Sequence, residues 1–259
     1  MSKGSGERSI STRIIMNKKE RLDFLVQQKC PHLSRNQVQG FIMQGKVSVD
    51  GIVVIKAGTP TMTDALIVVD ADVPKYVSRA GFKMEGVLIH FAIDVTDLVI
   101  MDAGISTGGF TDCLLQNGAK KVYGIDVGYG QVHEKIAKDS RVEVIERTNL
   151  RYVKSVGELV DLVTLDLSFI SVLKVMEAVI SVLKPTGRLI VLIKPQFEAR
   201  REQVGRGGII KDDAIHQEVV ARISQGIIDC GFECVGVIES SILGGDGNKE
   251  FLGYFFKKV

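Results

Sequence analysis

Four charged residues could together hold a reacting group and stabilise a developing negative charge. Asp166 closes the apolar run LVTL, and Lys194 directly follows the run LIVLI. A lysine after five apolar residues is costly to bury unless an opposite charge compensates it, and Asp166 is the obvious partner. Lys83 lies on a predicted helix in SRAGFKMEG, and Glu250 opens the last predicted strand in GNKEF. Each charge alone could be structural, but together they indicate a polar cleft.

A glycine-rich turn, DAGISTGGFTD at 102–112, joins an apolar strand to a helix, the position at which such folds bind nucleotide cofactors. A dinucleotide fingerprint needs glycine at the third position of the turn, where the backbone approaches a pyrophosphate. That position is Ser106, which weakens the nicotinamide interpretation without excluding it. A Walker phosphate loop is excluded, because Gly-Lys-Ser/Thr does not follow.

S-adenosylmethionine fits this turn better, because it has no pyrophosphate. Asp126 ends the second predicted strand and could accept hydrogen bonds from a ribose. Asp102 suits a ligand with a cationic amino group, and Asn149 could lie near the adenine edge. The full set of expected cofactor contacts is Asp102, Gly104, Ser106, Thr107, Gly108, Gly109, Phe110, Asp126, Asn149 and Asp166.

The elements that position these residues alternate between strand and helix. Strands are predicted at 97–102, 121–126, 142–146, 160–166, 188–193, 233–239 and 251–257. Helices are predicted at about 79–92, 108–117, 130–138, 172–183 and 213–229. This alternation predicts an α/β fold with a doubly wound, mostly parallel, seven-stranded Rossmann-like sheet. Because ligands bind beyond the carboxyl ends of such strands, Asp166 and Lys194 should face the cleft.

A smaller α+β domain is predicted at 18–73, between a flexible arm at 1–17 and a linker at 74–78 that leads to the domain at 79–259. Ser34 is a good helix N-cap, and Asp50-Gly51 is a strong hairpin signal. The first 60 residues hold ten basic and four acidic residues, although the whole chain has a net charge of only +2. Such a local excess suits phosphate binding.

This stretch resembles the RNA-binding module of ribosomal protein S4 in RLDFLV, LSRNQVQGFIMQGKVSVDG and ALIVV. The resemblance implies that basic and polar side chains of the second helix and hairpin contact structured RNA. Those residues are Arg21, Arg35, Asn36, Gln37 and Lys46.

The larger domain resembles the TlyA family, historically labelled hemolysins, and the FtsJ ribosomal-RNA 2′-O-methyltransferases. The motifs in common are YVSRAGFKME, DAGISTGGFTDCLLQNGAKKVYGIDVGYGQ, ERTNLR, DLSFIS, IKPQFEA, GGIIKD and GNKEF. The resemblance implies methyl transfer from S-adenosylmethionine to a ribose 2′-hydroxyl, of cytidine, in ribosomal RNA or ribosomal subunits. It also implies that Lys83, Asp166, Lys194 and Glu250 form the catalytic set. Either lysine could orient the hydroxyl, stabilise an alkoxide or act as base.

Two other functions compete with this one: an RNA-binding or ribosome-assembly factor that binds the cofactor without turnover, and a membrane-lytic hemolysin. The sequence offers no apolar run long enough to span a bilayer and no signal peptide core. The four cysteines fit reduced thiols in a cytoplasmic protein, and no metal-ligand pattern accompanies them. The sequence leaves the oligomeric state open.

Overall fold

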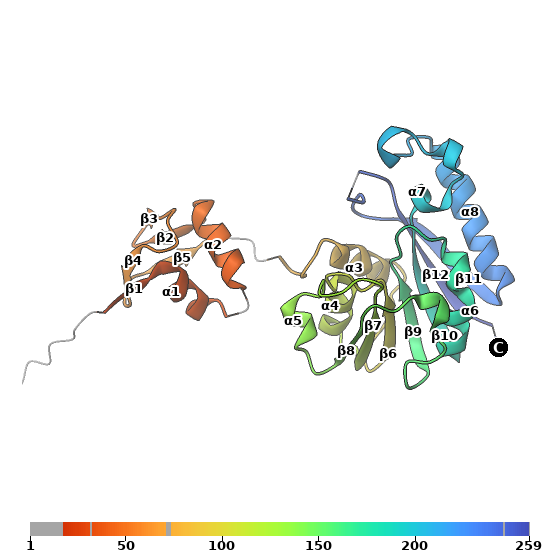
Figure 1. The fold of residues 1–259 in the computed structure, drawn as a ribbon, viewed down its shortest axis with the longest axis horizontal. Helices are drawn as coiled ribbons and strands as arrows, with labels where there is room; N and C mark the ends of the chain where they lie inside the picture. Colours follow the sequence, from red (N-terminus) through yellow and green to blue (C-terminus); the bar gives the residue numbers. More distant parts are fainter. Residues whose placement is uncertain (1–17, 32, 71–73, 246, 259) are drawn as a thin grey trace, which may run out of the picture. The chain divides into compact units, whose positions relative to one another are not determined.

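The computed structural model describes residues 18–31, 33–70, 74–245 and 247–258, and it divides the chain into two compact units (Figure 1). The first unit is residues 1–73 and the second is residues 74–259. The arm predicted at 1–17 lies outside the described residues.

The described residues of the smaller unit form two helices and five short strands. The helices are α1 (Leu22–Lys29) and α2 (Arg35–Met43). The strands are β1 (Lys19–Arg21), β2 (Val47–Val49), β3 (Ile52–Val53), β4 (Pro60–Met62) and β5 (Ile67–Val69). β1 pairs with β4, and β3, β2 and β5 form an antiparallel sheet in that order.

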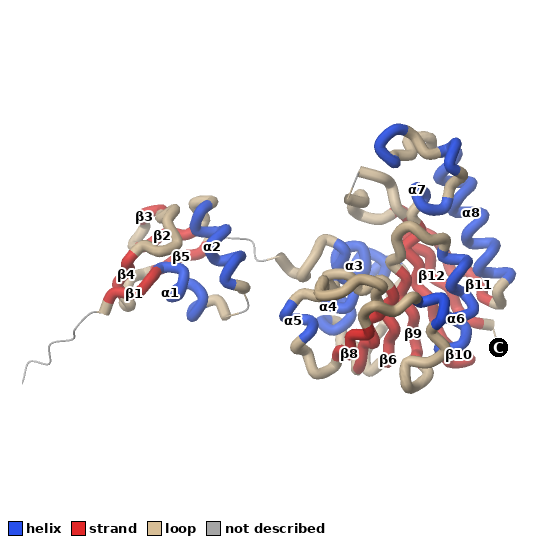
Figure 2. Tube along the Cα trace, in the orientation of Figure 1, coloured by secondary structure: helices blue, strands red, loops and turns tan. Residues whose placement is uncertain are grey.

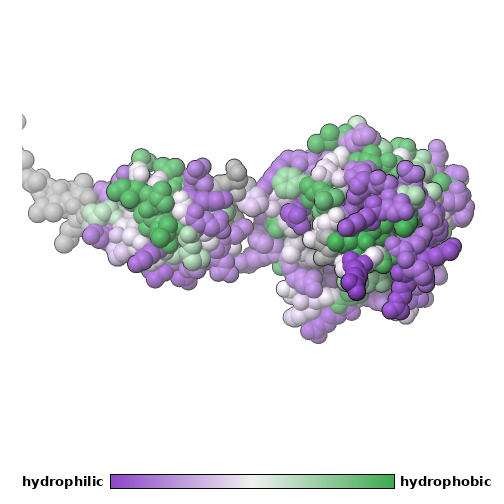
Figure 3. Space-filling view, turned by 90° about the horizontal axis from the view of Figure 1, so that it is seen from above, coloured by the Kyte–Doolittle hydropathy of each residue, from purple (hydrophilic) through white to green (hydrophobic). Residues whose placement is uncertain are grey.

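Local sequence signals explain the shape of this unit. Ser34 and Gln37 form a capping box at the start of α2, in which each side chain bonds the other residue's backbone N–H. Asp50 and Gly51 have φ values of 50° and 80°, the left-handed pair that a two-residue hairpin requires. The core is formed by α1, α2, β2 and β5, while Ile52 remains 72% exposed. Exposed apolar side chains of this unit form part of its hydrophobic surface in Figure 3.

The larger unit is built on one seven-stranded sheet, in the order β11-β12-β10-β9-β6-β7-β8. Its strands are β6 (Val99–Ala103), β7 (Lys121–Ile125), β8 (Val142–Ile145), β9 (Val160–Leu165), β10 (Leu183–Ile193), β11 (Phe232–Glu239) and β12 (Phe251–Lys257). β12 runs antiparallel to its neighbours β10 and β11, and the other pairings are parallel. The predicted doubly wound α/β fold is therefore confirmed.

Helices cover both faces of this sheet (Figure 2). One face packs against α3 (Ala80–His90), α4 (Gly109–Gln116) and α5 (Glu134–Ala137). The other packs against α6 (Met176–Val182) and α8 (Asp213–Asp229). The chain leaves β6 toward one face and β9 toward the other, so strand order reverses between these two central strands. A crevice at their carboxyl ends is the expected ligand site.

Residues 74–78, expected to form a linker, belong to the larger unit. Tyr76 is 2% exposed and packs within the core on the α3 side. Its ring lies so close to Gly81 that a Cβ there would come within 2.3 Å of it. The backbone N–H of Val77 donates to Asp112 at 2.9 Å. This segment therefore fixes the start of α3 and is not a free connection.

Two helix predictions also differ from the structure in extent. The predicted helix at 130–138 is only α5, and the one at 172–183 divides into a 3₁₀ turn, η2 (Val172–Val175), followed by α6. No helix among the described residues is long and apolar enough to cross a membrane.

Candidate active site

The glycine-rich turn after β6 closes tightly over the end of β9. Gly104 has a φ of 84°, and a Cβ on it would lie 2.4 Å from the backbone oxygen of Asp166. Ser106 and Gly108 also have left-handed backbones, with φ values of 49° and 94°. A Cβ on Gly109 would lie 2.2 Å from Oγ of Ser78. The turn therefore packs against the start of α3 with no room for larger residues.

Asp102 lies behind this turn and not in a cavity wall. It is 1% exposed and accepts hydrogen bonds from the hydroxyls of Thr111 at 2.6 Å and Thr164 at 2.7 Å. Burial raises the pKa of Asp102 to about 6, and the nearby charge of Asp166 acts in the same direction. The direct contact with a cationic amino group expected from the sequence is not the role this geometry favours. Asp102 instead joins the turn to α4 and β9.

Asp126 follows β7 and fixes the turn from the other side. One carboxylate oxygen accepts from the N–H of Ser106 at 2.9 Å, and the other accepts from the N–H of Gly128 at 2.7 Å. Asn149 accepts from the N–H of Arg151 at 3.1 Å and caps a short 3₁₀ turn, η1 (Leu150–Tyr152). Asp126 and Asn149 both line the same cavity.

Two cavities open at the carboxyl ends of β6 and β9. The first is about 250 Å³ and is lined by Ser78, Arg79, Ala80, Lys83, Gly104, Ile105, Ser106, Thr107, Gly109, Phe110, Asp166, Ile242, Leu243 and Gly245. The second is about 420 Å³ and is lined by Gly104, Ser106, Ile125, Asp126, Val127, Gln131, Thr148, Asn149, Leu150, Asp166, Leu167, Ser168, Phe169, Ile170 and Val175. Gly104, Ser106 and Asp166 line both cavities, so the two spaces meet at these residues. Gly108, also expected near the cofactor, instead packs against Ile136 of α5.

Two ion pairs reach the first cavity, one through Asp166 and the other through Lys83. Nζ of Lys194 lies 2.6 Å from Oδ1 of Asp166 and donates to Oγ of Ser168 at 3.0 Å. Lys83 pairs with Glu250, and both side chains are almost fully buried, at 10% and 4% exposure. The structure therefore brings together the four charged residues singled out from the sequence, as two lysine–carboxylate pairs.

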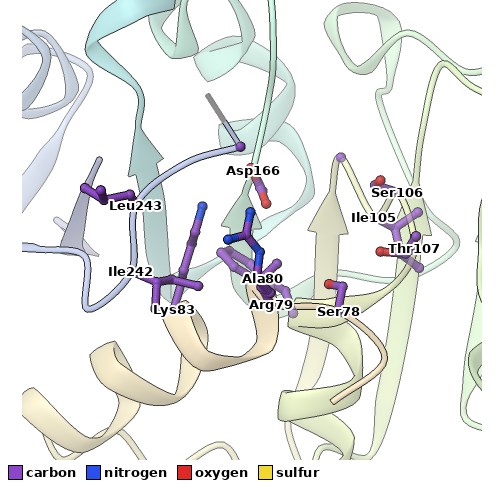
Figure 4. Close-up of a pocket in the computed structure, with 14 residues that line it drawn as sticks. Ser78, Arg79, Ala80, Lys83, Ile105, Ser106, Thr107, Asp166, Ile242 and Leu243 are labelled. Carbon is purple, nitrogen blue, oxygen red and sulfur yellow. The ribbon is translucent and has the colours of Figure 1, made fainter. Parts of the chain in front are cut away.

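Sequence reasoning overlooked Arg79 and Gln196. Figure 4 shows the side chains of Arg79 and Lys83 rising from the start of α3 toward Asp166. Nε2 of Gln196 donates to Glu250 at 3.4 Å and helps to hold that carboxylate. Arg79 lies in SRAGFK and Gln196 in KPQFE, so both are in motifs already noted, but nothing in the sequence shows their orientation.

The RNA-contact candidates lie in the smaller unit. Arg21 forms a bidentate pair with buried Asp23, at 2.9 and 2.8 Å, and Arg35 lies 3.9 Å from the same carboxylate. The hydrogen bond from Arg21 is the main reason that the pKa of Asp23 is lowered to about 2. Asn36 is exposed, and Nζ of Lys46 lies 5.8 Å from the ring of Phe41.

Gln37 differs from the other candidates, because its amide oxygen bonds the N–H of Ser34 within the capping box. That oxygen already has a partner inside the protein. Arg21 and Arg35 thus share one anchor, while Gln37 serves the helix start.

Comparison with known proteins fits this arrangement. Residues 76–257 match the FtsJ-like methyltransferase family, and residues 20–60 match the S4 domain. The 16S/23S rRNA (cytidine-2′-O)-methyltransferase TlyA of Mycobacterium tuberculosis is 41% identical over 84% of this chain and 82% of its own length. Hemolysin A of Brachyspira hyodysenteriae is 41% identical over 91% of this chain and 99% of its own.

A solved structure from Streptococcus thermophilus, titled a hemolysin, is 37% identical. It superimposes with a TM-score of 0.70 over 93% of this chain and 89% of that chain. The chain therefore belongs to the FtsJ-like methyltransferase family, among relatives named TlyA and hemolysin, and carries an S4 domain before its methyltransferase domain.

Proposed function

We propose that this protein transfers a methyl group from S-adenosylmethionine to the ribose 2′-hydroxyl of a cytidine in ribosomal RNA. The main structural support is the junction of two cavities at Asp166, with the ammonium of Lys194 beside it. One cavity can hold the donor and the other the acceptor, so the reacting atoms would meet at this ion pair. The target nucleoside and the RNA class come from the name of the relative in Mycobacterium tuberculosis.

The residues present fit S-adenosylmethionine. Asp126 uses its carboxylate to accept two backbone N–H groups, which leaves lone pairs for ribose hydroxyls. Apolar side chains of Ile125, Leu150 and Leu167 line the same cavity and suit an adenine ring. When bound, the cofactor would supply an electrophilic methyl group on sulfur.

Lys194 would orient the acceptor. Methyl transfer is an in-line displacement, so much of the rate depends on holding the hydroxyl oxygen against the methyl group. Nζ of Lys194, held 2.6 Å from Oδ1 of Asp166, can donate to the ribose oxygen as negative charge develops there. The carboxylate of Asp166 lines both cavities and would receive the hydroxyl proton. Asp166 also carries negative charge, which suits the cationic donor before transfer.

Lys83, held by Glu250, would support the acceptor from the side of the first cavity. Lys83 lines the first cavity, and Glu250 holds its ammonium from behind. A Cβ on Gly244 would lie 2.5 Å from Oε1 of Glu250, so the loop before β12 packs directly on this carboxylate. Lys83 is thereby held where it can donate to a ribose or a phosphate of the substrate.

The smaller unit would bind structured RNA with Arg21 and Arg35, whose shared anchor Asp23 limits their freedom. The described cysteines are all free thiols, and we place the activity in the cytoplasm.

The decisive experiment compares wild type with Lys194→Ala on unmodified 16S and 23S ribosomal RNA and on ribosomal subunits, using methyl-labelled cofactor. We expect the variant to lose about 10²- to 10³-fold in methyl transfer, the usual effect of removing one electrostatic stabiliser. Cofactor binding, measured by calorimetry, should change little. Methyl transfer by the variant at the wild-type rate would contradict the mechanism. Failure of the wild type to label any RNA would favour a cofactor-binding assembly factor.

A further inference from the structure

A basic loop, residues 200–211, follows α7 (Pro195–Glu198) and takes no part in the mechanism above. Its sequence, RREQVGRGGIIK, contains four basic residues and one acidic residue. The four are Arg200, Arg201, Arg206 and Lys211, and all are exposed. None of them forms an ion pair with any residue in the part of the chain that the structure describes.

The backbone of the basic loop is fixed although its cations are not. Gln203 donates to Glu218 of α8 at 2.9 Å. Asn248, only 2% exposed, accepts from the N–H of Ile210 and donates to the oxygen of Gly208, both at 3.0 Å. Because like charges on a fixed backbone repel one another, an uncompensated group of this kind is typical of a surface for an anionic ligand.

The loop adjoins the catalytic cleft. Figure 1 shows the segment between α7 and α8 beside the segment that precedes β12, and the Asn248 bonds join the two. The segment before β12 also supplies Ile242 and Leu243 to the first cavity. The same loop begins six residues after Lys194. A polymer chain with one residue bound in the cleft therefore continues past the basic loop.

Two glycines give the loop its shape. Gly207 and Gly208 have φ values of 77° and 76°, and a Cβ on either would meet nothing within 4 Å. Packing therefore does not require glycine here, whereas the left-handed backbone favours it. The chain reverses directly after Arg206, so this arginine stands at the turn.

We propose that the basic loop binds phosphates of the RNA strand that flanks the methylated nucleotide. This inference rests on the proposed function, because it takes the acceptor to be a nucleotide within an RNA chain. The backbone of that chain is continuous, so a ribose in the cleft keeps neighbouring phosphates near the basic loop. Arginine suits this contact, because its planar guanidinium donates two parallel hydrogen bonds to a phosphate.

The test compares the double variant Arg201→Ala/Arg206→Ala with the control double variant Lys120→Ala/Lys258→Ala. Lys120 precedes β7 and Lys258 follows antiparallel β12. Both control cations are exposed, and both lie at the end of the strands opposite the catalytic cleft. The assay follows methyl transfer to unmodified 16S and 23S transcripts and to ribosomal subunits. The KCl concentration is varied about sixfold, from about 50 to about 300 mM. Binding of the labelled transcripts is measured alongside.

For the loop variant we expect a higher KM with little change in kcat, and a shallower salt dependence. Loss of two phosphate contacts should lower the slope of log binding constant against log salt by about 1.4 to 1.8. Cofactor binding should match the wild type, and the control variant should resemble the wild type throughout. If wild type methylates RNA and both double variants keep its slope and KM, the loop assignment is wrong.

A defect seen only with subunits, and not with naked RNA, would also overturn the assignment, in favour of contact with a ribosomal protein. If wild type labels no RNA, the proposed function itself fails. The two failures are therefore distinguishable.

Discussion

Replacing Asp102 by asparagine should stabilise the protein near neutral pH. The carboxyl is buried behind the cofactor turn, and its pKa is raised from 3.8 to about 6, chiefly because burial penalises the charged form. A native state that holds a proton more tightly than the unfolded chain is favoured at low pH. The stability from this group is therefore fully present below pH 3.8 and is lost as pH rises to about 6.

The size of the effect follows from that shift. At about 1.4 kcal/mol per pKa unit, the full loss is roughly 3 kcal/mol. Proton linkage places about 1.4 kcal/mol of this loss of stability between pH 5 and pH 7.5. The asparagine side chain would carry no charge at either pH, and its amide can still bond Thr111 and Thr164. We therefore expect the variant to gain about 1.4 kcal/mol over wild type between the two pH values.

Urea unfolding followed by tyrosine fluorescence measures this gain in the full chain. All five tyrosines lie in the larger unit and tryptophan is absent from the sequence, so the signal reports on that unit. Groups that do not interact with Asp102 titrate equally in both proteins and cancel in the difference. Glu143→Gln, which removes an exposed carboxylate on β8, should show no such gain and serves as the control.

One result would refute the reasoning. If Asp102→Asn changes the free energy of unfolding by the same amount at pH 5 and pH 7.5, the carboxyl does not titrate in this window. Its hydrogen bonds, and not its desolvation, would then dominate.

Four further variants test the site and the Asn248 clamp. Lys83→Met leaves the buried carboxylate of Glu250 without its cation and should lower stability by about 3–5 kcal/mol in urea unfolding. Adding Glu250→Gln should recover most of that stability but not methyl transfer; equal stability of the single variant would contradict the buried pair. Gly104→Ala places a Cβ 2.4 Å from the backbone of Asp166, so calorimetry should show cofactor affinity falling by at least about tenfold. Asn248→Ala should lose about 1–3 kcal/mol, because it leaves the buried N–H of Ile210 without a partner, and unchanged urea midpoints would argue against this clamp.

The architecture of the larger unit could be predicted from its sequence because buried parallel strands are short apolar runs between turn residues. The runs LVIM and LIVLI correspond to β6 and β10, and the alternation with helices determines that the sheet is doubly wound. The position of Lys194 directly after a run also placed it at the carboxyl edge. Its pairing with Asp166 could be predicted because both residues follow strands at this end of the sheet and because a buried lysine needs an opposite charge.

Features set by distant contacts could not be predicted in this way. The linker assigned to residues 74–78 is packed because Val77 bonds Asp112, 35 residues away. Strand position placed Asp102 near the end of β6, but it did not show that two threonines would hold it behind the turn. The orientation of Arg79 depends on how α3 meets the turn, which local periodicity does not report.

The close packing of the cofactor turn also affects how mutational data on this protein should be interpreted. Gly81 and Gly109 have no space for a methyl group, because each lets neighbouring segments approach closely. A saturation scan scored by growth would rank them with Lys83 and Lys194 as intolerant positions. A parallel scan scored by cellular abundance would separate the classes, since glycine variants should be degraded while Lys194 variants accumulate as inactive protein. Intolerance to substitution alone would therefore overestimate the extent of the reacting centre.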